Sequence, residues 1–200
     1  MRAGLLGLLL LATPLAAQEG PQPDLAEGEA VEVELRADLN GDGLPDLAYI
    51  AAREESRELR VVTSYRSPTD FGLNPVETLP LDPYPLGDGV LKLKGNVLTL
   101  EELSGGTTAV FSTHRFRWDP KLAAMRLIGL DATLYSRTYA HDGAEASWNL
   151  LTGDLVTRTL KLRQRTYDKV GERKSKKPSK PVRLEQAPSG GDLLGWPGAQ

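Results

Sequence analysis

The chain has 200 residues, of which 40% are hydrophobic and 26% charged, with 20 glycines, 14 prolines and no cysteine. This composition is typical of a globular domain and excludes a disulfide scaffold, a thiolate zinc site and a cysteine nucleophile. The formal net charge is −3, and only two histidines are present, so a three-histidine metal site is excluded as well.

The amino-terminal residues 1–17 have the pattern of a secretory signal peptide. Arg2 gives an early positive charge, residues 5–12 are apolar apart from one glycine, and small residues precede a polar stretch. The apolar run is shorter than the ~20 residues that a membrane-spanning helix needs. We therefore expect cleavage near Ala17, a flexible segment at 18–29, no transmembrane segment, and a mature protein that is periplasmic or extracellular.

The first expected strand begins a β domain that we assign to residues 30–166. Val31, Val33 and Leu35 alternate with charged residues, which is the period of two of a half-buried strand.

The loop that follows, residues 38–46, has oxygen-bearing side chains at alternate positions. Calcium prefers six to eight oxygen ligands, and loops of this kind supply them from positions 1, 3, 5 and 9 and from the carbonyl of position 7. The expected Ca²⁺ ligands are Asp38, Asn40, Asp42, Asp46 and the carbonyl of Leu44. Gly43 allows the sharp turn at position 6, whereas Tyr49 stands where an EF-hand has its glutamate. The alternative is a plain hairpin turn that binds nothing.

The rest of the β domain reads as short strands separated by turns. We expect strands over residues 47–52, 59–65, 90–93, 97–103, 107–118, 125–130, 146–151 and 155–165. No stretch has a sustained helical stripe, and no internal repeat is present. The pattern predicts an all-β fold, which would be an antiparallel sandwich, a barrel or an open curved sheet with one calcium-binding hairpin loop, and not a complete propeller.

Both histidines have ordinary structural interpretations. His114 shares one face of its expected strand with Val110 and Phe116, so we interpret it as a packed core or interface residue. His141 precedes Asp142-Gly143 and is interpreted as part of a turn.

Positive charge is concentrated near the carboxyl terminus, where residues 158–183 contain 11 Lys and Arg against 2 Asp and Glu. We assign 167–200 to a basic, then Pro/Gly-rich tail, and expect residues 171–182 to form a solvated loop. Its four lysines that could contact an anionic envelope polymer are Lys174, Lys176, Lys177 and Lys180. The alternative is a loop that only balances an acidic domain. No aromatic residues interleave with the lysines, which argues against nucleic acid. Whether 182–184 return as a strand stays open.

The calcium loop carries a resemblance to a known family. Residues 38–46 followed by Leu47–Ile50 resemble the calcium loop of FG-GAP/VCBS-type repeats. Three downstream segments are similar to those of small secreted bacterial proteins with one such loop, namely His114–Trp118, Arg126–Gly129 and Asn149–Gly153. The resemblance implies a calcium site in a secreted protein and implies no activity.

Two classes of function fit these observations. The first is a secreted or periplasmic calcium-binding β domain, which would be a non-catalytic binding or envelope-interaction module with a structural calcium. The alternative is an extracellular hydrolase of a glycan or phosphoester, with carboxylates such as Glu101 or Asp131 as acid and base. The missing catalytic pattern favours the first class, so we do not expect an enzyme.

Overall fold

The computed structural model describes residues 20–196, and the expected signal peptide lies outside them. Strands account for 58% of the structure and helices for 5%, so the expected all-β fold is confirmed. The first strands are β1 (Ala30–Ala37), β2 (Asp46–Arg53), β3 (Ser56–Val62), β4 (Ser64–Arg66), β5 (Phe71–Leu73), β6 (Glu77–Pro80) and β7 (Val90–Lys94). The later strands are β8 (Val97–Gly105), β9 (Thr108–Asp119), β10 (Ala124–Ser136), β11 (Gly143–Asn149), β12 (Asp154–Arg163), β13 (Thr166–Lys176) and β14 (Val182–Arg183).

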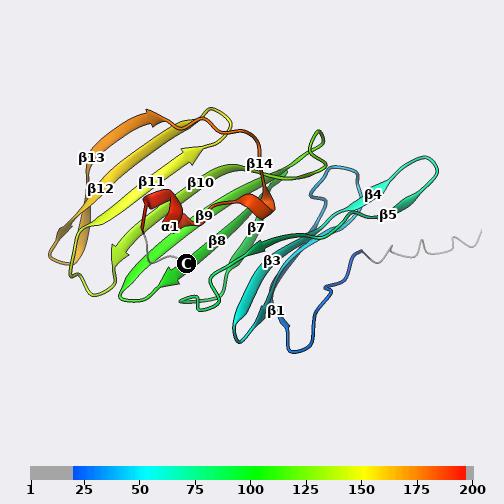
Figure 1. Ribbon diagram of the computed structural model, residues 1–200, viewed down its shortest axis with the longest axis horizontal. Helices are drawn as coiled ribbons and strands as arrows, with labels where there is room; N and C mark the ends of the chain where they lie inside the picture. Colours follow the sequence, from blue (N-terminus) through cyan, green and yellow to red (C-terminus); the bar gives the residue numbers. More distant parts are fainter. Residues whose placement is uncertain (1–19, 197–200) are drawn as a thin grey trace, which may run out of the picture.

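Residues 20–196 form two main antiparallel sheets and one two-stranded sheet. The small sheet has the order β1-β2-β3-β6, and the large sheet is a meander from β7 to β13 in which each strand pairs with its neighbour in sequence. Neither sheet closes on itself among the described residues, so the barrel alternative is excluded. Figure 1 shows the small sheet at one end of the large sheet, whose strands β11 to β13 continue beyond it. The short hairpin β4–β5 projects away from both sheets.

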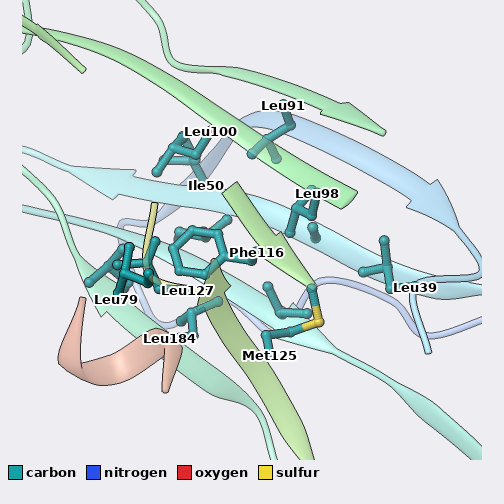
Figure 2. Close-up of a cluster of buried hydrophobic side chains, with 14 of the residues drawn as sticks. Leu39, Ile50, Leu79, Leu91, Leu98, Leu100, Phe116, Met125, Leu127 and Leu184 are labelled. Carbon is teal, nitrogen blue, oxygen red and sulfur yellow. The ribbon is translucent and has the colours of Figure 1, made fainter. Parts of the chain in front are cut away.

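The main core lies between the small sheet and strands β7 to β10. Phe116 of β9 is fully buried at its centre, with Ile50 of β2 on one side and Leu127 of β10 on the other (Figure 2). These residues point inward because alternate residues of a strand share one face. Truncating a buried Phe costs about 3–5 kcal/mol, so this cluster holds the two sheets together.

A second, smaller cluster covers the outer face of β2. Leu47, Tyr49 and Ala51 are buried there, although Ile50 between them faces the main core. The Tyr49 hydroxyl lies 3.1 Å from both the backbone nitrogen and the carbonyl oxygen of Asp24. The residues 20–29 that we expected to be a flexible segment are therefore held against the small sheet.

The expectation of a solvated basic loop at 171–182 is wrong, because β13 extends to Lys176 as the edge strand of the large sheet. Nine of the 11 residues of β13 are solvent-exposed, on both faces of the strand, so no apolar alternation marks this strand in the sequence. The chain then returns as β14, which pairs Val182 with Leu127 and so lies beside β10 where β11 does not reach.

The returning chain ends in helical turns that the sequence pattern did not reveal. A 3₁₀ turn, η1 (Leu184–Gln186), buries Leu184 in the main core, and helix α1 (Gly190–Leu194) packs on β9, β10 and β11 (Figure 1). A capping box between Ser189 and Asp192 starts this helix. No helix in the described part of the chain is long and apolar enough to cross a membrane.

A buried carboxyl group joins the two sheets at β6. Both oxygens of Glu77 accept the backbone N–H of Met125, at 2.9 and 3.0 Å. Burial raises the pKa of Glu77 to about 7, although the Met125 N–H acts in the opposite direction. The folded state therefore binds more protons than the unfolded state between about pH 4.5 and 7.

This raised pKa predicts that stability falls as the pH rises through 7. Glu77→Gln removes the buried charge, and we expect it to stabilise the fold at pH 8.5 by on the order of 2 kcal/mol, with little effect at pH 5. Urea unfolding at both pH values measures the difference, with Glu55→Gln at an exposed turn as the control. A Glu77→Gln variant that is equally stable relative to wild type at both pH values would contradict it.

Candidate metal centre

The predicted calcium loop connects β1 to β2. Asp38 organises it, because its Oδ1 accepts the N–H of Gly41 at 2.6 Å and its Oδ2 accepts the N–H of Gly43 at 2.9 Å. Both glycines have positive φ angles, +83° and +80°, a conformation that side chains with a Cβ rarely adopt. The sequence thus folds this loop around the Asp38 carboxylate.

The side chains of the next two predicted ligands each accept the backbone N–H of the residue two positions later. Asn40 Oδ1 accepts the N–H of Asp42 at 3.0 Å, and Asp42 Oδ1 accepts the N–H of Leu44 at 2.8 Å. The Asn40 side-chain amide also donates to the carbonyl of Ser64 at 2.6 Å. These bonds hold the side chains in the loop while Asp38 and Asp42 remain solvent-exposed.

Asp46 differs from the other predicted ligands because it is fully buried. Its Oδ2 accepts the N–H groups of Leu39 and Asn40, at 2.7 and 3.2 Å. Its Oδ1 accepts both the N–H and the hydroxyl of Ser64, at 2.7 and 2.8 Å. Burial raises the pKa of Asp46, whereas these four bonds lower it.

The oxygen-bearing side chains of the loop suit a hard cation, whereas Asp46 is occupied by hydrogen bonds within the protein. Asp38, Asn40 and Asp42 offer carboxylate and amide oxygens, and an oxygen that accepts one N–H keeps a second lone pair. Asp46 uses all of its roughly four lone pairs within the protein, so it orders the loop in this state. Among residues 20–196, no group of three or more His, Asp and Glu side chains is close enough to hold a metal ion by itself. A cation here would need the Asn40 amide, the Leu44 carbonyl and water as further ligands.

The lysines predicted to contact an anionic polymer mostly have partners within the chain. Lys174 lies 3.4 Å from a Glu172 oxygen, and Lys176 lies 2.6 Å from an Asp154 oxygen. The ammonium group of Lys177 lies 4.5 Å from the centre of the Trp148 ring, whose indole N–H donates to the Lys177 carbonyl. Lys180 has no ion-pair partner in the part of the chain that the structure describes. The positive charge of this strand is therefore largely compensated.

The two carboxylates considered for a hydrolase do not form a common site. Glu101 accepts two hydrogen bonds from Lys92 on the β7–β8 hairpin. Asp131 lies on β10, on the other side of β9 from Glu101. It accepts hydrogen bonds from Arg115 and from the Ser147 hydroxyl. In the sheet register Thr113 lies between them, which separates the two backbones by about two strand spacings, or roughly 10 Å.

The two histidines lie in different parts of the fold and contact different groups. His141 lies in the β10–β11 connection and contacts Thr108 and the carbonyl of its neighbour Asp142. The Asp142 carboxylate pairs with Lys161, so the two residues are not a catalytic pair. His114 is buried on the inner face of β9, in agreement with the core interpretation.

Three polar residues that are distant in the sequence lie close together, which the sequence pattern alone did not predict. Asp82, Glu102 and His114 all line one cavity between the β6–β7 loop, β8 and β9. Period-two alternation along 97–103 and 107–118 places Glu102 and His114 on inner faces, but the pairing register is needed to bring them together.

Comparisons with protein-family models, with curated proteins and with solved structures find no match to this chain.

Proposed function

We propose that this chain is a calcium-stabilised, non-catalytic β domain that acts as a binding module outside the cytoplasm. The observation that carries the proposal is the hydrogen-bonded geometry of the loop 38–46, in which three oxygen-bearing side chains are held at alternate positions of one turn. Its resemblance to FG-GAP/VCBS-type loops and the signal-like residues 1–17 support the same proposal.

The proposed ligands are the side chains of Asp38, Asn40 and Asp42 and the carbonyl of Leu44, with water completing the six to eight oxygens that calcium prefers. Asp46 supports the site by holding the loop against Ser64. Extracellular calcium modules often have dissociation constants of about 10⁻⁴ to 10⁻³ M. Calcium at a hundred times the dissociation constant adds about 2.7 kcal/mol to the stability of the folded state.

The partner that we propose for this module is an anionic envelope polymer at β13 and the residues that follow it. Lys180 offers an uncompensated charge there, whereas Lys174 and Lys176 would have to exchange their acidic partners for the polymer. Such an interaction is electrostatic, so it weakens as salt rises.

The proposal predicts that calcium protects the wild-type chain against heat and does not protect Asp42→Ala. In calcium at about a hundred times the dissociation constant, we expect Asp42→Ala to lose the stabilisation of about 2–3 kcal/mol that the ion provides. In chelator, we expect a change of about 1 kcal/mol or less, because only one part-buried hydrogen bond, from the Leu44 N–H, is lost. Thermal melts with and without calcium measure both effects.

The matched control is Asp88→Ala, which removes an exposed aspartate from the β6–β7 loop. We expect this control to keep the calcium-dependent shift of the melting temperature. An equal loss for Asp42→Ala in calcium and in chelator, or the same loss for Asp88→Ala, would contradict the proposed site.

A further inference from the structure

Strand β13 is a long free edge of the large sheet. It pairs with β12 on one side, and within residues 20–196 no strand pairs with its other side. Figure 1 shows it in orange, at the end of the large sheet that is remote from the small sheet. The N–H of Lys177 donates to the carbonyl of Gly153, so the chain turns back across β12 and leaves this edge uncovered. The unpaired N–H and C=O groups of such an edge can pair with another chain.

A β-bulge in β13 changes which of its side chains share a face. The register pairs Thr157 with Arg173 and Thr159 with Val170, so a step of two residues along β12 corresponds to a step of three along β13. The extra residue is Gly171, whose φ of +62° suits a bulge. Beyond the bulge, the alternation of side chains is therefore shifted by one residue.

This shift sorts the charged residues of β13 into two pairs. Asp168 and Arg173 share one face, although an odd number of positions separates them, because the bulge lies between them. Lys169 and Glu172 share the opposite face, where both belong to a network of ion pairs around Arg158. Each face thus carries one acidic and one basic residue, on opposite sides of the strand centre.

The charge pattern complements itself when two copies of β13 run antiparallel. With the pair centred on Val170, Asp168 of one copy lies opposite Arg173 of the other, and Lys169 lies opposite Glu172. The two-fold symmetry repeats both pairs. Opposite charges directly across two strands are favourable, whereas like charges are unfavourable. A parallel pair in register would place every charge beside its own copy, so the pattern selects the antiparallel arrangement.

The residues of this pattern are available for a second copy. Asp168 lies 3.6 Å from Arg163, which is a loose contact, and Arg173 has no ion-pair partner in the described part of the chain. Lys169 is exposed and could extend its network to a carboxylate of the second copy. Val170 at the centre is 42% exposed and would be shielded from water by its own symmetry mate.

We propose that two copies of this chain associate through β13, antiparallel about Val170, so that their large sheets form one continuous sheet. The paired segment extends from Tyr167 to Lys174, which lie opposite each other, and Lys177 and Lys180 lie outside it. Because both copies use the same edge, the assembly closes as a dimer and does not grow into a filament. The association is independent of the calcium loop and of the proposed polymer.

Sedimentation velocity of the purified full chain, from about 5 to about 500 µM at low salt, tests the proposal. We expect a dimer that forms as the concentration rises. Lys169→Glu places like charges opposite Glu172, and Glu172→Lys places like charges opposite Lys169, so each variant alone should self-associate at least about tenfold more weakly. An equimolar mixture of the two variants should dimerise again, because every facing pair then has opposite charges.

The matched control for charge reversal is Lys92→Glu. Lys92 lies on β7, the other edge strand of the large sheet, and it pairs with Glu101 of the neighbouring strand, as Lys169 pairs with Glu145. The control therefore loses a similar contact within the chain and should dimerise like the wild type. Recovery in the mixture excludes an effect of the charge change on folding, because mixing alters no contact within either chain.

Cross-linking tests the register without any change of charge. The chain has no cysteine, so Val170→Cys introduces a single thiol. Facing residues of antiparallel strands have Cα atoms about 4.5–5.5 Å apart, a distance that a disulfide can span. Mild oxidation should therefore give a covalent dimer. Val90→Cys on β7 is the matched control, since Val90 is 40% exposed on the other edge, and it should remain monomeric.

Several outcomes would overturn the proposal. Sedimentation as a monomer at every concentration would do so, as would equal self-association of the wild type and the two charge-reversal variants. A mixture of Lys169→Glu and Glu172→Lys that stays monomeric would exclude the proposed facing pairs. Equal cross-linking of Val90→Cys and Val170→Cys, or loss of the dimer in Lys92→Glu, would exclude β13 as the interface.

Discussion

Replacing Arg57 by methionine is expected to destabilise the fold by about 3–5 kcal/mol at pH 7. The Arg57 side chain is almost fully buried and links three strands, because it pairs with Glu32 of β1 and Glu102 of β8 from its own position on β3. Both carboxylates are also largely buried, so without Arg57 their charges would be desolvated with no cation beside them. Removing one member of a buried ionic cluster leaves that desolvation uncompensated.

The environment of Arg57 leaves little room for rearrangement. A Cβ on Gly89 would lie 2.6 Å from Ile50 and 2.9 Å from the Arg57 guanidinium, so the β6–β7 loop approaches the arginine closely at this glycine. The Gly89 N–H donates to Glu32 at 2.6 Å, which ties the loop to the same cluster. We expect Arg57→Met to loosen this loop as well as the contact between the sheets.

Urea unfolding at pH 7 and pH 5 measures the effect of Arg57→Met. The loss should shrink at pH 5, because carboxylates without a cation have raised pKa values and become neutral there. Combining Arg57→Met with Glu32→Gln and Glu102→Gln should recover part of the stability, since no buried charge is left unpaired. A loss below 1 kcal/mol, or a loss that the triple variant does not reduce, would show that the cluster does not hold the sheets together.

Asp46→Ala is the second change with a large expected effect, about 4 kcal/mol in chelator. The substitution leaves the N–H groups of Leu39, Asn40 and Ser64 without their acceptor, and two of these residues are buried. An unsatisfied buried donor costs about 1–3 kcal/mol.

Denaturant unfolding in chelator separates the two roles that Asp46 could have. If Asp46 orders the loop as the structure shows, the loss appears without calcium, and Asp42→Ala under the same conditions loses less than about 1 kcal/mol. If Asp46→Ala were as stable as the wild type in chelator and less stable only in calcium, its role would be that of a metal ligand alone.

The sheets could be predicted wherever one face of a strand is buried. Val110, Ser112 and Phe116 point to the inner face of β9 as their alternation indicates, and the Gly95-Asn96 turn joins β7 to β8. The length and type of these elements follow from a period of two and from turn residues with positive φ.

Other elements escaped prediction for identifiable physical reasons. Strand β13 exposes both faces, so its stability comes from backbone pairing with β12 and from cross-strand pairs such as Arg158 with Glu172. Strand β6 begins with Glu77, a residue that rarely lies in a core. Helix α1 is too short for a periodic stripe, and its only local signal is the capping box of Ser189 and Asp192.

The calcium loop and the cavity also differ in how far they can be predicted from the sequence. The loop 38–46 is local in sequence, so spacing alone predicts its ligands. The cavity beside Glu102 and His114 depends on the register of β8 with β9 and on Pro188, which lies 74 residues after His114. No local pattern reports a contact of this kind.

Calorimetric titration of calcium into the chelator-stripped chain, residues 18–200, measures directly whether the loop 38–46 binds the ion. We expect binding of one calcium ion per chain and a higher melting temperature of the bound protein, with both effects absent in Asp42→Ala. No heat of binding and no change of melting temperature at millimolar calcium would contradict it, and would leave residues 38–46 as a hydrogen-bonded turn between β1 and β2.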